Sequence, residues 1–188
     1  MKVTDDLRHD HAVFLVALEL LDAVVAALDK SDAEAEGHLA GLLEFFSSFV
    51  DYCHHGKEEE CLFPALEKCG LPRDGGPIGV MLSEHEFGRA LLHQMRGALA
   101  RLGEGDATAR ADLREAARGY HAFLQAHIYK ENNVLFAMAD RFVPADAAAA
   151  LDDACDVIER ERGSRRQSYS QMLDGLRVRY GVALSAPT

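Results

Sequence analysis

Residues 54–64 read HHGKEEECLFP, and they continue a helical run of apolar side chains. His54 follows the apolar Val50 by four residues, and Glu58 follows His54 by four. Residues four apart lie on the same face of a helix, one turn from each other. A carboxylate on an apolar face costs several kcal/mol unless it is paired or coordinated. The stretch therefore predicts a helix that carries a histidine and a glutamate into the protein core.

Three other segments repeat this pattern. The spacing of apolar residues predicts long helices over about residues 5–30, 77–103 and 106–142, in addition to the one that holds residues 54–64. Each puts one histidine on its apolar face, and the last adds a glutamate four residues later; these residues are His11, His85, His127 and Glu131. Four amphipathic helices with short connections predict an all-α fold, an up-down-up-down four-helix bundle over residues 1–143. Residues 144–188 form an additional C-terminal helical segment in this prediction.

The composition excludes several classes of protein. The formal net charge of −11 would repel phosphate backbones, so no nucleic-acid partner is expected. The apolar stretch 12–28 contains Glu19 and Asp22, so no membrane partner is expected either. The N-terminus lacks the pattern of a signal peptide, and the four cysteines form no C-x-x-C pair. These features predict a cytoplasmic protein. The basic run 160–166 is interpreted as a solvated helix face.

A metal centre explains the inward-facing polar residues best. A single histidine on an apolar stripe is usually a core residue with one hydrogen-bond partner, and a His/Glu pair four residues apart is commonly a surface pair. Four such histidines together with two glutamates are harder to explain in this way, because no lysine or arginine other than Arg89 shares their stripes. Two metal ions would neutralise both glutamates and bind the imidazoles. Histidine and carboxylate ligands without thiolate suit iron, manganese or zinc.

The motifs resemble those of hemerythrin-like (HHE cation-binding) domains. The resemblance rests on HHGKEEECLFP (54–64), on Gly76-Pro77 followed by Glu84-His85, on HIYKENNVLF (127–136) and on Asp10-His11, and it covers about residues 5–142. It implies a non-haem centre of two iron ions with an oxo or hydroxo bridge, for which zinc or manganese could substitute. By this resemblance, the first iron would bind His11 and His54, the second would bind His85 and His127 and keep an exchangeable position, and Glu58 and Glu131 would bridge them.

The sequence departs from oxygen-carrying members of that family. Their third helix has His-x-x-x-His, whereas His85 is followed four residues later by Arg89, and their last pair is one residue wider than His127 and Glu131. One histidine ligand is therefore missing. His55 is the candidate replacement, and Glu59 or water are the alternatives; Glu59 could also pair with His55 on the helix flank. Arg89 would bind a bridging glutamate or guard the exchangeable position.

Several functions are compatible with this site. The pattern favours a protein that binds or senses a small diatomic ligand (oxygen or nitric oxide) or iron, rather than an enzyme. The alternatives are a redox or repair enzyme, acting on iron-sulphur clusters, peroxide or nitric oxide, and a bundle held by structural zinc. The C-terminal segment has apolar positions such as Leu151 and Leu173. It would either cover the bundle or form the face of a homodimer, and the sequence leaves both open.

Overall fold

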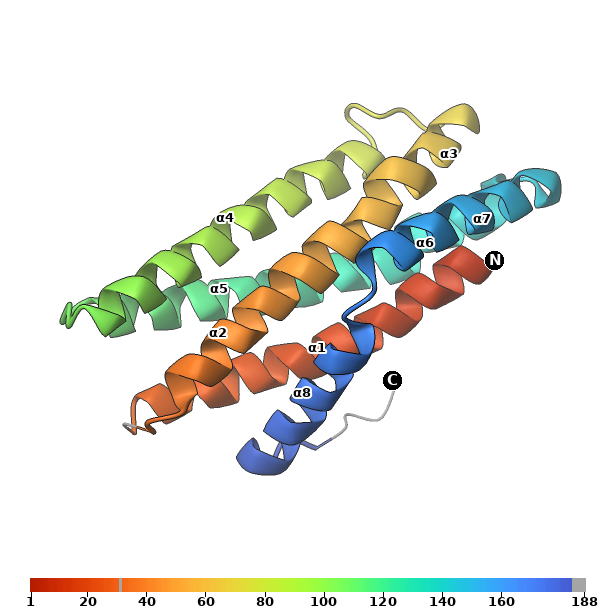
Figure 1. Cartoon of the computed structure of the whole chain (residues 1–188). Coiled ribbons are helices and arrows are strands. Elements are labelled where there is room, and N and C mark those ends of the chain that lie inside the picture. Colours follow the sequence, from red (N-terminus) through yellow and green to blue (C-terminus); the bar gives the residue numbers. More distant parts are fainter. Residues whose placement is uncertain (31, 184–188) are drawn as a thin grey trace.

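Four helical rods run up, down, up and down, and two further helices pack beside them (Figure 1). The structure, a computed structural model, describes residues 1–30 and 32–183. The first and third rods are single helices, α1 (Lys2–Leu28) and α4 (Pro77–Gly103). The second and fourth rods are composite: α2 (Ala35–Phe45), η1 (Phe46–His55), η2 (Glu58–Leu62) and α3 (Phe63–Lys68), then α5 (Ala109–Lys130), η3 (Glu131–Leu135) and α6 (Phe136–Phe142). The predicted all-α bundle is confirmed.

The three η segments are π-helical, and all of them lie where the histidines and glutamates cluster. His54 and His55 end η1, while Glu58 begins η2 and Glu131 begins η3. A π turn is closed by i→i+5 hydrogen bonds, so it is wider than an α turn and is found mostly at functional sites. The two consecutive histidines are both buried. The sequence indicated helix here but gave no sign of the wider turns.

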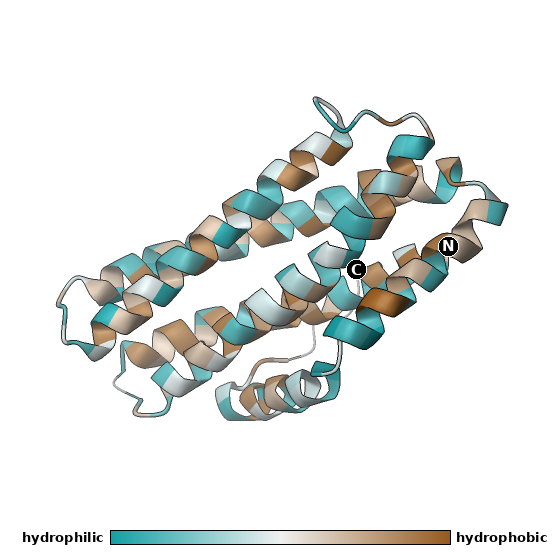
Figure 2. Cartoon of the chain, turned by 45° about the horizontal axis from the view of Figure 1, so that its top comes forward, coloured by the Kyte–Doolittle hydropathy of each residue, from teal (hydrophilic) through white to brown (hydrophobic). Residues whose placement is uncertain are grey.

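The polar residues separate two apolar cores. The larger core, around Phe14, Phe46 and Tyr120, fills the half of the bundle near the α4–α5 connection. The smaller core, around Leu7 and Phe136, fills the other half. Figure 2 shows hydrophobic and hydrophilic positions alternating along the helices, the pattern expected of amphipathic helices. Each rod therefore carries its histidine at the junction of the two cores, away from water.

The C-terminal segment covers the bundle along α1 and the second rod. It consists of α7 (Ala145–Arg162) and α8 (Arg166–Tyr180). α7 contacts η1, η2 and α1, and α8 contacts α1 and α2. The buried Leu151 belongs to the smaller core and the buried Leu173 to the larger one. The segment thus contributes to both cores, so its apolar face covers the bundle, which is one of the two predicted roles. Residues 184–188 lie outside the described part of the chain.

Among the described residues, one helix, α1, is long and apolar enough by length and composition to cross a membrane. Half of its most apolar stretch is buried inside the bundle. The same helix carries Asp10 and His11 into the protein interior, where both are buried. The buried face of this helix packs in the two cores.

Candidate metal centre

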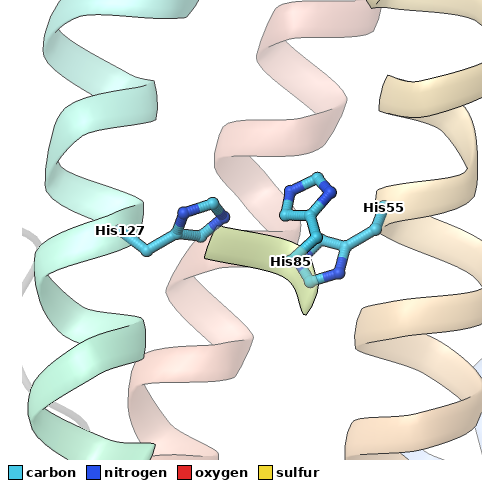
Figure 3. Close-up of side chains that lie close together, drawn as sticks. All are labelled: His55, His85 and His127. Carbon is cyan, nitrogen blue, oxygen red and sulfur yellow. The ribbon is translucent and has the colours of Figure 1, made fainter. Parts of the chain in front are cut away.

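All seven residues proposed as ligands meet at the junction of the two cores. They form two groups in which one potential ligand atom from each residue lies within 4.8 Å of the others: His55, His85 and His127 in one, and His11, His54, Glu58 and Glu131 in the other. We call the first the three-histidine group, the pair His11 and His54 the two-histidine group, and Glu58 and Glu131 the central glutamates. Figure 3 shows the three-histidine group, contributed by the second, third and fourth rods.

Each central glutamate faces both groups with its two oxygens. Glu58 directs Oε1 toward His54 Nε2 at 3.6 Å and Oε2 toward His85 Nε2 at 3.4 Å. Glu131 directs Oε2 toward His11 Nε2 at 3.1 Å and Oε1 toward His127 Nε2 at 3.2 Å. Two carboxylates arranged in this way can each bridge two ions. With both bridges counted, the two-histidine group offers four protein ligand atoms and the three-histidine group offers five.

Every histidine of the site has a hydrogen-bond partner at Nδ1. In each histidine, Nδ1 points away from the centre and lies 2.7–3.3 Å from a side-chain oxygen. The pairs are His11–Asn132, His54–Asp10, His55–Asp51, His85–Glu59 and His127–Glu84. A carboxylate oxygen accepts only, so Nδ1 carries the proton in the four carboxylate pairs. Nε2 is then the atom that would present its lone pair to a bound metal ion. Such outer partners are typical of histidines that bind metal.

The polar atoms at the centre lack the hydrogen bonds that burial demands. Both oxygens of Glu58 and of Glu131, together with Nε2 of His85 and His127, are buried and have no hydrogen-bond partner in the described residues. Unsatisfied buried carboxylates are strongly unfavourable. Metal ions would occupy these atoms and offset the charge of the glutamates. The residues present therefore fit a pair of metal ions better than they fit a closed polar core.

The charges inside the site are strongly coupled. Burial alone would raise the pKa of Glu131, but His127, His11 and His85 outweigh it and hold that pKa well below its usual range. Burial alone would lower the pKa of His85, but Glu131, Glu58 and Glu59 raise it well above its usual value. Burial and the neighbouring His85 lower the pKa of His55. Without a metal ion, the site thus holds ionised carboxylates beside a protonated His85, which would release its Nε2 proton when a cation binds.

Around the three-histidine group, Glu59 and Arg89 make contacts other than those predicted from the sequence. His55 is buried and stacks on His85 with ring centroids 3.8 Å apart. Glu59 does not pair with it, because its carboxylate accepts from His85 Nδ1 at 2.7 Å, while Asp51 accepts from His55. Arg89 contacts neither central glutamate; it binds Asp51 and Glu59, each at 2.8 Å. The sequence signal for Asp51 as the acceptor of His55 was its position four residues earlier, on the same helix face.

The comparisons with known proteins agree with this geometry. The sequence model of the hemerythrin HHE cation-binding domain matches residues 2–139. Two similar proteins, one from Mycobacterium tuberculosis and one from Mycobacterium bovis, both named as uncharacterized proteins, are each 25% identical to the chain over 132 residues. This match covers 70% of the chain and 51% of each relative, so the chain spans about half the length of these curated relatives. No solved structure matches the chain.

Proposed function

The chain belongs to the hemerythrin HHE cation-binding family, and on that basis we propose that it is a non-haem di-iron protein that binds or senses oxygen, nitric oxide or iron. The observation that carries the proposal is the placement of the central glutamates, whose paired oxygens face two separate histidine groups. The family and the two clusters support cation binding.

Iron fits the donor set better than zinc does. Structural zinc is almost always four-coordinate, whereas the three histidines and the two facing oxygens of Glu58 and Glu131 make five protein ligand atoms. Thiolates are absent from both groups. Cys53, beside His54, directs its thiol to Glu159, and burial raises its pKa to about 12. Two iron ions, when bound, would supply reversible electron transfer and coordination positions for a small ligand.

The chain's own residues would direct that ligand to the two-histidine group. This group provides one histidine fewer, so it leaves more positions for a diatomic molecule. If His55 is a ligand, the exchangeable position moves from the second iron, where the resemblance placed it, to the first. Aromatic rings enclose the group: His11 stacks on Phe136 with centroids 5.4 Å apart, and Phe14 meets His54 edge-on at 4.8 Å. Their apolar surfaces shield this side of the group from water.

The decisive experiment measures the metal content and the optical spectrum of protein produced in iron-rich medium, before and after reduction and exposure to oxygen. We expect about two irons per chain, with near-ultraviolet bands of a bridged pair that change reversibly with the ligand. Irreversible oxidation would favour the redox or repair enzyme instead. Colourless protein that holds only zinc would favour a structural site, and protein that binds no metal would contradict the proposal.

A further inference from the structure

A ring of four buried or half-buried charges joins the C-terminal helices to the metal centre. Asp10, 1% exposed, accepts hydrogen bonds from His54 Nδ1 at 3.3 Å, Lys57 Nζ at 3.0 Å and Arg166 at 2.7 Å. Asp10 is therefore the carboxylate that holds a metal-facing histidine and also the acceptor for two cations. Arg166 belongs to α8, outside the residues matched by the family model.

Glu159 closes the ring on its far side. Its carboxylate accepts from Lys57 at 3.0 Å and from Arg166 at 2.8 Å, so the same two cations lie between Glu159 and Asp10. It also accepts from the thiol of Cys53 at 3.6 Å. We call Asp10, Lys57, Glu159 and Arg166 the charge ring. Two of its members come from the bundle and two from the C-terminal segment, and its formal charges cancel.

The charge ring lies where electrostatic effects are weakly screened. Burial alone would raise the pKa of Asp10, but His54, Lys57 and Arg166 hold it far below its usual range. Burial alone would lower the pKa of Lys57, but Asp10 and Glu159 outweigh it and raise that pKa. All four groups are charged at neutral pH. Arg166 is the most exposed of them at 40%, so its influence is smaller than that of Lys57.

We propose that Glu159 and Arg166 are positioning residues that set how much negative charge Asp10 presents to His54, and through it the reduction potential and affinity of the metal position at the two-histidine group. This inference rests on the proposed function. A carboxylate behind a metal-binding imidazole raises the basicity of that ligand. Lys57 and Arg166 oppose this effect, because they partly neutralise the carboxylate of Asp10. Glu159 weakens their influence, because it binds the same two cations.

The two residues therefore act in opposite directions. Arg166→Gln removes a cation from Asp10, so His54 becomes a stronger donor and the oxidised, more highly charged metal is favoured; the reduction potential falls. Glu159→Gln releases Lys57 and Arg166 to Asp10, so His54 becomes a weaker donor and the reduction potential rises. A purely structural role for the charge ring would not give shifts of opposite sign from two substitutions that each remove one charge.

The test uses the full chain in the iron-loaded form and measures its reduction potential by spectroelectrochemistry. We expect a lower potential in Arg166→Gln, a higher one in Glu159→Gln, and a potential close to that of the unsubstituted protein in Arg166→Lys, which keeps the cation. Arg165→Gln is the matched control, because the neighbouring Arg165 pairs with Glu44 and lies outside the charge ring. Shifts of the same sign, or none in either variant, would overturn the inference.

A cobalt(II) titration of the metal-free chain, followed by visible absorption, makes the test independent of iron. Outer partners of metal-binding histidines change metal affinity by about 10–100-fold, and one bond further out we expect about three- to tenfold. The dissociation constant should fall in Arg166→Gln and rise in Glu159→Gln. If the chain binds cobalt but not iron, the di-iron proposal fails while this titration still decides the role of the ring. If it binds neither metal, both proposals fail.

Discussion

The two histidine groups are built from similar parts but supported by different regions of the chain. The three-histidine group is braced within the bundle: Glu84 holds His127, and Asp51 and Glu59, tied together by Arg89, hold His55 and His85. The two-histidine group is braced partly from outside it, because Asp10 behind His54 is fixed by Arg166 of α8.

This difference separates two tasks. A group with three histidines and partners from its own bundle is suited to hold its ion permanently. On the proposed function, the group with two histidines would leave more positions for an exchangeable ligand, and part of its support comes from α8, which lies outside the residues that the family model matches. We therefore expect changes in the C-terminal helices to affect the two-histidine group more than the three-histidine group.

The largest effect is expected where the two groups share residues. Glu131→Ala removes an oxygen from each group at once, and it leaves Nε2 of His11 and His127 without their nearest carboxylate. We expect the metal content of this variant to fall from about two ions per chain to fewer than one, measured by elemental analysis after gel filtration. Glu19→Ala, at an exposed position of α1, is the control and should keep both ions. Two tightly bound ions in Glu131→Ala would contradict the shared site.

Removing single histidines should distinguish the groups. His54→Ala leaves its ion one histidine and two carboxylate oxygens, so we expect about one ion per chain. His55→Ala leaves its group with the same donor set that the two-histidine group has naturally, so we expect both ions to stay, one of them at least about tenfold more weakly bound, or ~1.4 kcal/mol.

Titration of the metal-free variants with iron(II), followed by elemental analysis, measures both quantities. His121→Ala is the control, since His121 pairs with Asp22 and belongs to neither group. Affinity in His55→Ala equal to that of the unsubstituted chain would show that His55 is not a ligand and that water completes the second position.

Removing a hydrogen-bond acceptor of Nδ1 should reduce metal affinity less than removing a ligand does. Glu84→Gln keeps the shape of the side chain but weakens the acceptor for Nδ1 of His127, 2.9 Å away. We expect the affinity of the three-histidine group to fall by about tenfold, with the two-histidine group unaffected. Competition with a chelator measures the two constants. Glu115→Gln, at an exposed position of α5, is the control. An equal loss at both groups would mean that the ions are coupled too strongly for separate support.

The sequence predicted the residues that face the centre, because helical spacing determines which side chains share an apolar face. Spacing predicted six of the candidate ligands, the family resemblance added His55, and the structure brings all seven together. Their role as ligands stays a prediction. The domain boundary at 143/144 is likewise untested, although α7 begins at Ala145.

The partners behind the ligands were less predictable, because they depend on how helices pack. Glu59 and His85 are on different rods, and Asp10 and Arg166 are separated by 155 intervening residues. The basic run 160–166 was expected to be a solvated face. Instead, Arg162 binds Glu60 at 2.7 Å and Arg166 reaches the site. Spacing along one helix cannot indicate such contacts between helices.

The smallest predicted effect is the pH-dependent contribution of Glu159, in the charge ring, to the free energy of unfolding. Burial alone would raise the pKa of Glu159, but Arg166 and Lys57 outweigh it and lower the pKa from 4.5 to about 2. A carboxyl group with a lower pKa in the folded state stabilises the fold above its unfolded pKa, and this contribution is lost as the pH falls from about 4.5 toward 2. Because Glu159 is 30% exposed, we expect only ~1 kcal/mol at pH 7.

Urea unfolding of the metal-free chain and of Glu159→Gln, compared between pH 7 and pH 3, measures this contribution. The difference in unfolding free energy should shrink between pH 7 and pH 3, because the unfolded chain then binds a proton at Glu159 that the folded chain still excludes, whereas the glutamine of the variant does not titrate. Glu161→Gln, at an exposed position on the same helix, should change stability by less than about 0.5 kcal/mol. A difference for Glu159→Gln that is as large at pH 3 as at pH 7 would mean that this residue acts through packing. The two-histidine group would then be supported by the shape of α7 and not by its charge.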